Sequence, residues 1–351
     1  MKAVLGLENG EYIIGEGFGV EGSCTGELVF TTQMSGYMEA LTDPSYAGQI
    51  LMFTYPTIGN YGVDMKNFQS PDIHPMGCVV REVCARPAAQ PALSDFFEER
   101  GLFGISGVDT RKLTIETRES GALRAALIVG DDNGESAVEA ARTARPISDI
   151  DLIRSVSCKE PFHIKGPGKR IAVLDMGIKK NIAISLRKRG ADLYIFPYNA
   201  TPAEIEACEP EALFVTNGPG DPRRATDAIS CVKYFIGKLP IFGICMGNQI
   251  AALALGAETY KMKFGHRGSN QPVRYLDGSI SITTQNHGFA VDETTLPEDC
   301  QVAYRNVNDG SLEGFISDDL DMLCVQFHPE AHGGPLDTER PIFDLMYRRI
   351  H

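Results

Sequence analysis

One cysteine of this chain lies in a sequence that favours nucleophilic chemistry, Gly243-Ile244-Cys245-Met246-Gly247. An apolar run typical of a strand precedes it, and a segment with helical composition follows. The flanking glycines allow a sharp strand-to-helix turn that projects the sulfur outward. The N-terminus of the helix favours a thiolate, and the N–H group of Met246 is placed to bind an oxyanion. Cys245 is therefore a candidate nucleophile, although an isolated cysteine is more often a small buried residue.

A histidine and a glutamate follow another apolar run, in Gln326-Phe327-His328-Pro329-Glu330. A thiolate nucleophile needs a base that later protonates the leaving amine, and an imidazole performs this near neutral pH. A third group must hold the ring, and Glu330 is close enough in sequence to do so. On its own the motif would usually be a surface turn. Its position about 80 residues after the cysteine turn, on the same kind of sheet, predicts a Cys-His-Glu triad.

A third motif, Thr216-Asn217-Gly218-Pro219-Gly220-Asp221-Pro222, also follows an apolar run. It predicts a rigid loop at the carboxyl edge of the sheet, where ligands bind in open α/β folds. The N–H groups of this loop are candidates for completing an oxyanion hole, and a plain turn is the alternative.

The elements that must position these motifs alternate between strand and helix. We expect strands at 170–175, 192–196, 212–216 and 240–244, and helices at 178–189, 225–236, 246–254 and 339–350. Continuous apolar strands alternating with helices predict a parallel sheet covered on both faces. Shorter strands are expected between residues 259 and 325. In the first 150 residues, short strands, many glycines and helices at 93–99, 109–119 and 135–143 predict a separate mixed domain.

Composition limits the possible partners. The net charge of −13 argues against nucleic acid, because phosphate binding needs patches of Lys and Arg. Residues 1–160 hold 13 Lys and Arg against 23 Asp and Glu, so the acidity is concentrated there, either as a solvated surface or as a face for a partner. The nine cysteines are scattered without a CxxC pair. No apolar run suggests a membrane span or signal peptide, and we expect a cytoplasmic protein.

The three motifs together resemble the class I glutamine amidotransferase family, over about residues 168–351. The beginning of the chain resembles the N-terminal domain of carbamoyl-phosphate synthetase small subunits. That resemblance rests on the stretches GELVFTT (26–32), SGYME (35–39), LTDPSY (41–46), YPTIGN (55–60) and DTRKLT (109–114). The expected fold class is α/β. A glutaminase domain (169–351), with a mostly parallel sheet flanked by helices, follows a linker (151–168) and a mixed α/β N-terminal domain (1–150).

The resemblance implies roles for individual residues. Cys245 attacks the side-chain amide of glutamine and forms a thioester, His328 moves the protons, and Glu330 orients His328. The implied glutamine pocket comprises Ser45, Gly218, Gly220, Met246, Gln249, Asn286, Gly288 and Phe289. Lys179 matches a lysine at the edge of the site, or is a solvated lysine at a helix start. His287 matches a residue that assists glutamine binding rather than acting as the base, or it serves a structural turn.

The resemblance also implies a partner. The chain has no GxxxxGK[ST] loop, and we expect neither a cofactor nor a metal in it. The expected partner is the large synthetase subunit, which would use ATP, magnesium and bicarbonate to convert the released ammonia for pyrimidine and arginine synthesis.

Three alternatives remain open from the sequence. The chain could deliver ammonia to a different acceptor, although the N-terminal domain argues against this. It could be a non-catalytic docking or regulatory subunit, which the presence of Cys245 disfavours. It could be another cysteine hydrolase, such as a peptidase, which the NGPGDP loop, Gln249 and Asn286 disfavour.

Overall fold

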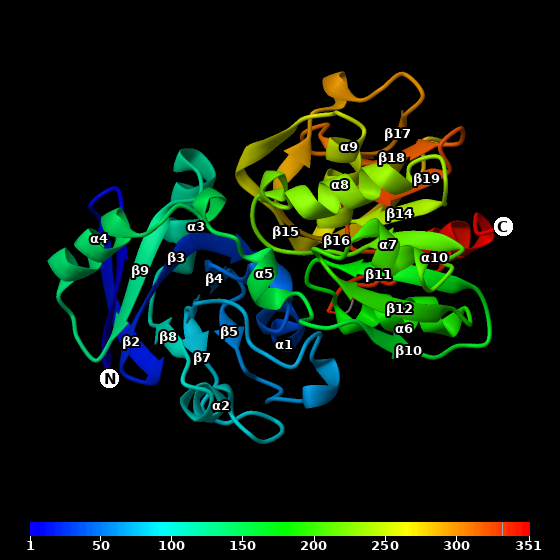
Figure 1. The fold of residues 1–351 in the computed structure, drawn as a ribbon. Helices are drawn as coiled ribbons and strands as arrows, with labels where there is room; N and C mark the ends of the chain where they lie inside the picture. Colours follow the sequence, from blue (N-terminus) through cyan, green and yellow to red (C-terminus); the bar gives the residue numbers. More distant parts are fainter. Residues whose placement is uncertain (332) are drawn as a thin grey trace. The chain divides into compact units, whose positions relative to one another are not determined.

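The computed structural model describes residues 1–331 and 333–351 of the chain. The chain forms two compact units, Met1–Ile150 and Asp151–His351, and each is described by itself. Figure 1 shows the elements of both units in sequence colours.

The first unit is built around a closed barrel of mixed strand direction. Apolar side chains of its strands, among them Leu5, Leu28 and Leu127, fill a core of buried residues. Parallel pairs join β3 to β4, β4 to β6 and β6 to β8, while the remaining pairs are antiparallel. In barrel order the strands are β1 (Lys2–Leu7), β2 (Tyr12–Gly19), β8 (Phe103–Ser106), β6 (Gly77–Val79), β4 (Gln49–Phe53), β3 (Gly22–Thr31) and β9 (Arg124–Val129).

Helices of the first unit form where the sequence predicted them. The side chains of Asp109 and Asn133 accept hydrogen bonds from main-chain N–H groups and begin two of the helices. A second core joins Phe96 and Phe97 to Leu51 and Tyr37. The elements outside the barrel are α1 (Tyr37–Leu41), η1 (Pro44–Tyr46), β5 (Thr57–Ile58), η2 (Met65–Asn67), β7 (Glu82–Val83), α2 (Leu93–Glu99), α3 (Thr110–Ser120), α4 (Gly134–Thr143) and η3 (Ile147–Asp149). The expected mixed α/β N-terminal domain is confirmed.

The second unit contains a ten-stranded sheet among the described residues. Its five neighbouring strands β12, β11, β13, β14 and β19 are parallel, and an antiparallel region continues from β19. In sheet order the strands are β10 (Phe162–Ile164), β12 (Asp192–Pro197), β11 (Arg170–Asp175), β13 (Ala212–Val215), β14 (Ile241–Ile244), β19 (Met322–Val325), β18 (Leu312–Ser317), β17 (Gln301–Asn306), β15 (Thr259–Tyr275) and β16 (Ile280–Val291).

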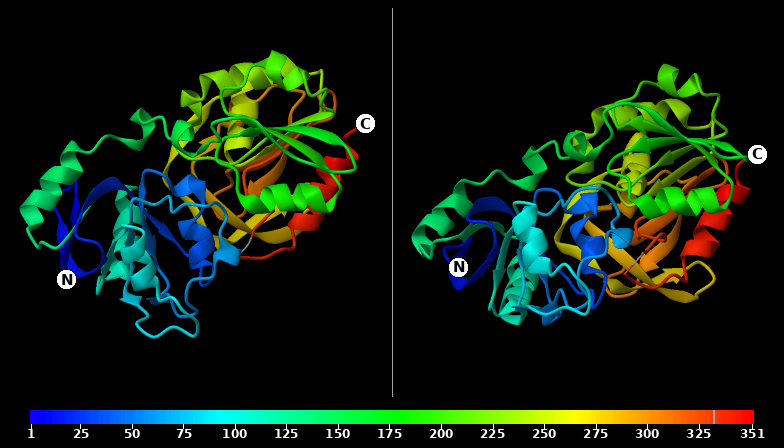
Figure 2. Two further views of the ribbon diagram at one scale, coloured as in Figure 1. Left: turned by 60° about the horizontal axis from the view of Figure 1, so that its bottom comes forward. Right: turned by 90° about the horizontal axis from the view of Figure 1, so that it is seen from below.

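Helices cover both faces of this sheet, as the apolar strands predicted. Side chains of α7, α8 and α9, including Ile205, Val232 and Ile250, pack on one face. Side chains of α6 and α10, including Ile182 and Phe343, pack on the other. Figure 2 shows these two helix layers from below. The helices and short 3-10 turns are α5 (Ile153–Val156), α6 (Lys180–Lys188), α7 (Pro202–Glu206), η4 (Pro222–Arg224), α8 (Thr226–Phe235), α9 (Met246–Ala254), η5 (Glu293–Thr295) and α10 (Glu339–Arg348).

Two segments differ from the expectation. Part of the segment predicted as a linker is regular structure, because residues 162–164 pair with β12 as an antiparallel edge strand. The short strands expected between residues 259 and 325 are present as β17, β18 and β19, but residues 259–291 form a long hairpin instead, with 17 residues in β15 and 12 in β16. Irregularities in the pairing between residues 261 and 271 divide β15, and its mixed polar composition hides a continuous strand from a pattern search.

No helix within residues 1–331 and 333–351 is both long enough and apolar enough to span a membrane.

Candidate active site

Cys245 occupies a strained turn between β14 and α9. Its φ of 55° and ψ of −102° lie outside the regions that L-residues usually adopt, and α9 begins at the next residue. A Cβ atom on Gly243 would lie 2.5 Å from the carbonyl carbon of Gly247. A Cβ atom on Gly247 would lie 2.1 Å from the carbonyl oxygen of Val215. The glycines are therefore required by the close approach of α9 to the sheet, and the predicted strand-to-helix turn is present.

His328 and Glu330 follow β19, the strand that pairs with β14. The N–H group of Cys245 donates to the Val325 carbonyl at 2.8 Å, so the turn that contains Cys245 begins beside the end of β19. The N–H group of His328 donates to the Thr284 carbonyl at 2.8 Å, which fixes the residue against β16. The His328 Nδ1 atom lies 2.7 Å from Glu330 Oε1, and both side chains are fully buried. This pairing leaves the opposite ring nitrogen available for proton transfer.

Lys179 belongs to the same cluster. Its Nζ atom lies 2.8 Å from Glu330 Oε1, and its side chain is only 7% exposed. The N–H group of Lys179 also donates to Asn217 Oδ1 at 3.2 Å, which joins the start of α6 to the loop after β13. Of the two readings left open from the sequence, burial rules out a solvated lysine. Lys179 instead gives the buried Glu330 carboxylate a positive partner.

The charges in this cluster oppose the effect of burial. Burial alone would raise the pKa of Glu330, but Lys179 and His328 hold it well below its usual range. Burial and Lys179 lower the pKa of His328, but Glu330 and Cys245 outweigh them and raise it to about 9. A hydrogen bond between the Cys245 thiol and the His328 ring contributes to this rise, so the sulfur lies beside the imidazole. The site therefore favours an imidazolium next to the sulfur and an ionised carboxylate behind it.

The loop after β13 packs tightly beside these groups. A Cβ atom on Gly218 would lie 2.3 Å from the Met176 carbonyl oxygen, and Gly220 adopts a φ of 85° that favours glycine. The N–H group of Met176 donates to Thr216 Oγ1 at 2.9 Å. The glycines thus allow a compact loop after β13, and its predicted role in an oxyanion hole stays a prediction.

The predicted glutamine pocket draws on α9 and β16. The Cys245 Sγ atom lies 3.6 Å from the Asn286 carbonyl oxygen. Gln249 Nε2 donates to the Phe289 carbonyl at 2.8 Å and to Gln326 Oε1 at 3.0 Å. These bonds hold the β16 segment that contains Gly288 beside the first turn of α9, where Met246 lies. Gln326 begins the motif that contains His328 and Glu330, but the sequence predicted no role for it. Its hydrogen bond with Gln249 shows that it helps to position the Gln249 side chain.

Ser45 is the predicted pocket residue that belongs to the first unit. It lies in η1, and its N–H group donates to Asp43 Oδ1 at 2.9 Å. The residue is buried. The proposed contact of Ser45 with glutamine stays a prediction.

His287 lies in a second buried cluster that the sequence did not reveal. His287 Nδ1 lies 2.9 Å from the Phe289 carbonyl oxygen, and its Nε2 lies 3.8 Å from Glu313 Oε1. His266 lies between Glu313 and Asp309, with its ring nitrogens 3.1 Å and 2.9 Å from their oxygens. Burial lowers the pKa of His287, whereas Asp309 and Glu313 outweigh burial and raise the pKa of His266 to about 9. His266 and Glu313 are 47 residues apart, and no short motif joins them.

The sheet, the cysteine turn and the His-x-Glu pair together define a class I glutamine amidotransferase domain. Residues 172–347 match the family described as "Glutamine amidotransferase class-I". Residues 5–127 match "Carbamoyl-phosphate synthase small chain, CPSase domain".

Curated relatives extend this match over nearly the whole chain. The carbamoyl phosphate synthase small chain of Methanosarcina acetivorans is 56% identical over 99% of this chain and 98% of its own length. Those of Archaeoglobus fulgidus and Methanocaldococcus jannaschii are 45% and 48% identical, over 96% and 99% of both chains. The chain belongs to the carbamoyl phosphate synthase small chain family. The resemblance inferred from the sequence motifs is confirmed.

Proposed function

We propose that this chain hydrolyses L-glutamine and delivers ammonia to a large synthetase subunit that makes carbamoyl phosphate. The observation that carries the proposal is the strained Cys245 turn at the start of α9, next to the buried His328–Glu330 pair. A buried cysteine with a structural role would need neither the backbone strain nor an imidazole beside it.

In the first half of the reaction, the Cys245 thiolate attacks the side-chain amide carbon of glutamine. The negative charge that forms on the amide oxygen is received by the N–H group of Met246 and a glycine N–H group of the Gly218–Gly220 loop. The C–N bond then breaks, and the proton on His328 passes to the leaving nitrogen. The products are ammonia and a glutamyl thioester on Cys245.

In the second half, water attacks the thioester carbonyl while His328 accepts a proton from it. Collapse of this intermediate releases glutamate and restores the thiolate and the imidazolium. Glu330 keeps the His328 ring oriented through the 2.7 Å contact, and Lys179 keeps the carboxylate ionised. In this proposal the rest of the glutamine pocket is formed by Gln249, Asn286, Gly288, Phe289 and Ser45.

A partner follows from the chemistry of ammonia. Free ammonia is protonated near neutral pH and is then no longer a nucleophile, so transfer inside a complex preserves its reactivity. We assign ATP, magnesium and bicarbonate to the large subunit, in keeping with the small chain family to which this chain belongs.

The decisive experiment replaces Cys245 by serine in the complex with the large subunit. We expect glutamine-dependent carbamoyl phosphate synthesis to fall by about 10³-fold or more, because the thioester cannot form at a useful rate. Synthesis from added ammonium chloride should stay near the wild-type rate. Both rates are measured as carbamoyl phosphate formed.

Cys208→Ser is the matched control, because Cys208 is half-buried and lies after α7, away from the nucleophile turn. It should retain both activities. Loss of the ammonia-dependent rate in Cys245→Ser would indicate a structural role for Cys245 and contradict the proposal.

A further inference from the structure

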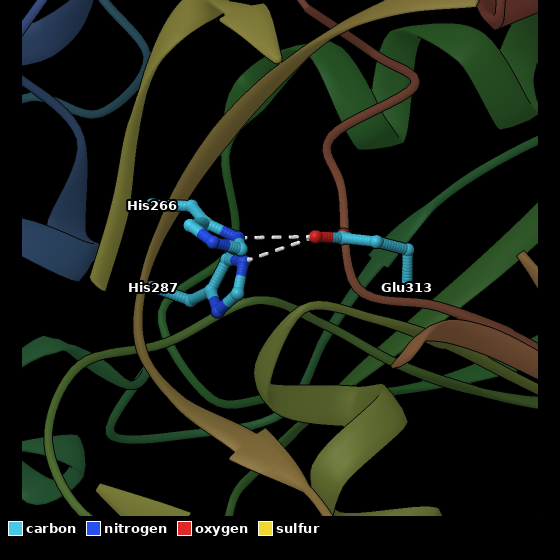
Figure 3. Close-up of side chains that lie close together, drawn as sticks. All are labelled: His266, His287 and Glu313. Carbon is cyan, nitrogen blue, oxygen red and sulfur yellow. Dashed lines mark hydrogen bonds and ion pairs between the residues drawn. The ribbon is translucent and has the colours of Figure 1, made fainter. Parts of the chain in front are cut away.

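Three side chains from different strands converge inside the second unit. His266 of β15, His287 of β16 and Glu313 of β18 are all buried. Figure 3 shows both imidazole rings directed toward the Glu313 carboxylate. Glu313 Oε1 lies 3.1 Å from His266 Nδ1 and 3.8 Å from His287 Nε2. One donor atom from each residue lies within 4.8 Å of the other two.

The outer nitrogen of each ring has its own acceptor. His266 Nε2 lies 2.9 Å from Asp309 Oδ2, and His287 Nδ1 lies 2.9 Å from the Phe289 carbonyl oxygen. A neutral ring that donates from its outer nitrogen presents a lone pair at its inner nitrogen. Histidines that bind metals in proteins are held in this way by a carboxylate or a carbonyl.

The centre of the cluster holds more acceptors than donors. Besides the two ring nitrogens and Glu313 Oε1, the Gln285 Oε1 atom lies 3.3 Å from His287 Nε2. Asn306 Nδ2 is a donor to this centre, 3.2 Å from Glu313 Oε1 and 3.3 Å from His266 Nδ1. Within the described residues, the buried Glu313 Oε2 atom has no hydrogen-bond partner. Converging buried acceptors are costly unless a cation lies among them.

We propose that His266, His287 and Glu313 form a binding site for one divalent transition-metal ion of the zinc type. Zinc bonds of about 2.0–2.1 Å in a tetrahedral arrangement place neighbouring donor atoms about 3.3 Å apart, close to the two separations seen here. Two imidazoles with one carboxylate suit zinc rather than magnesium or calcium, which prefer oxygen ligands. The proposal departs from the expectation, drawn from the sequence, that this chain holds no metal.

The metal would act on the structure around the nucleophile. The Phe289 carbonyl that accepts from His287 also accepts from Gln249 Nε2 at 2.8 Å. The neighbouring Asn286 carbonyl lies 3.6 Å from Cys245 Sγ. An ion that ties β15, β16 and β18 together would therefore stiffen the β16 segment beside Cys245. Metal binding itself does not depend on the proposed glutaminase role, because it is measured directly.

The alternative occupant of the same centre is a proton. Without a metal, a protonated His266 would bridge Glu313 and Asp309 as a buried ion pair. The two possibilities differ in metal content, and a binding experiment separates them.

The test uses the full chain after dialysis against a chelator and then against metal-free buffer. Zinc chloride is added, unbound zinc is removed by gel filtration, and bound zinc is measured by inductively coupled plasma mass spectrometry. We expect about one zinc per chain, and a higher melting temperature than for the metal-free protein. Cobalt chloride should give the visible bands of tetrahedral Co²⁺ without the near-ultraviolet band of a thiolate ligand.

Variants show where the ion binds. Glu313→Gln and His266→Asn should each lose the bound zinc and the zinc-dependent rise in melting temperature. Cys245→Ser should retain one zinc, which excludes binding by the Cys245 sulfur. His163→Asn is the matched control for histidine loss, because His163 lies in β10 and pairs with Asp192.

Wild-type protein that binds no zinc would overturn the proposal in favour of the ion-pair network, as would undiminished zinc binding by Glu313→Gln. If a variant fails to fold, the cobalt spectrum of the wild-type chain decides whether the metal is bound by nitrogen and oxygen ligands, as proposed, or by a cysteine. A thiolate band there would place the metal at a cysteine and also overturn the proposal.

Discussion

Two buried histidine–glutamate clusters lie in the same unit, and their contacts differ. In the first, Glu330 Oε1 accepts from His328 at 2.7 Å and from Lys179 at 2.8 Å, and the thiol of Cys245 lies beside the ring. In the second, Glu313 faces two histidines and is not paired with a lysine among the described residues.

The difference is consistent with the proposed catalytic role of the first cluster. Both pairs are buried and both carboxylates have lowered pKa values. In the mechanism proposed for the first cluster, each nitrogen of the His328 ring has a different role, because Nδ1 contacts Glu330 and the other nitrogen exchanges a proton with the reacting groups at Cys245. In the second, the inner ring nitrogens point to one shared centre, which suits an ion rather than a proton transfer. Variants of matched residues in the two clusters can therefore separate their roles.

The largest expected effect compares His328→Asn with His266→Asn. Loss of His328 removes the proposed base and acid, and we expect glutaminase kcat to fall by about 10³–10⁴-fold. His266→Asn should lower it by less than about 10-fold, because His266 would act only through the position of β16. Glutamate release is measured for both variants, and circular dichroism verifies folding. Equal losses would remove the distinction between the clusters.

The next effect concerns stability. Lys179→Met removes one of the two positive groups that face the fully buried Glu330 and leaves only His328, so we expect the free energy of unfolding to fall by about 3 kcal/mol. Urea denaturation followed by fluorescence or circular dichroism measures this. Lys233→Met, at an exposed position of α8, is the control and should change stability by less than about 0.5 kcal/mol. A small loss in Lys179→Met would show that the ion pair does not stabilise the fold.

A smaller catalytic effect is expected for Glu330→Gln, a loss of about 10–10²-fold in kcat with little change in KM. The amide can still contact the ring, but it no longer stabilises an imidazolium. Glu313→Gln should instead lose bound zinc while keeping most of the kcat. A loss in Glu330→Gln larger than that in His328→Asn would contradict the assigned roles.

The sequence predicted the first cluster because chemistry and chain order coincide there. The Cys245 turn, the loop of Gly218 and the His328-x-Glu330 motif are each short, and each follows an apolar strand of one parallel sheet. Parallel strands end at a common edge, so their motifs meet without any long-range information. The pairing of Lys179 with Glu330 was not predicted, since 151 residues separate them and the lysine belongs to no motif that requires a carboxylate.

The sequence did not predict the second cluster because antiparallel pairing decides it. His266 lies opposite His287 only because β15 contains irregularities that reset its register, and a one-residue shift would turn the side chain to the other face. Glu313 reaches the cluster through β18, which pairs with β17 rather than with β15. The spacing of His266, His287 and Glu313 along the sequence therefore does not indicate that they are in contact.

The smallest expected effect is a dependence of stability on pH that belongs to the first cluster. The pKa of His328 rises to about 9 in the folded chain from an ordinary value of 6.5. The folded state therefore binds a proton more tightly than the unfolded state, so this contribution is complete below pH 6.5 and is lost as pH rises through 9. We expect a loss of about 2 kcal/mol between pH 6.5 and 8.5.

The measurement is the difference in free energy of unfolding between wild type and His328→Asn at each pH. Because His266 is present in both proteins, its titration contributes equally to both and cancels in this difference. If the difference in free energy of unfolding does not change with pH, His328 carries no proton in the resting enzyme.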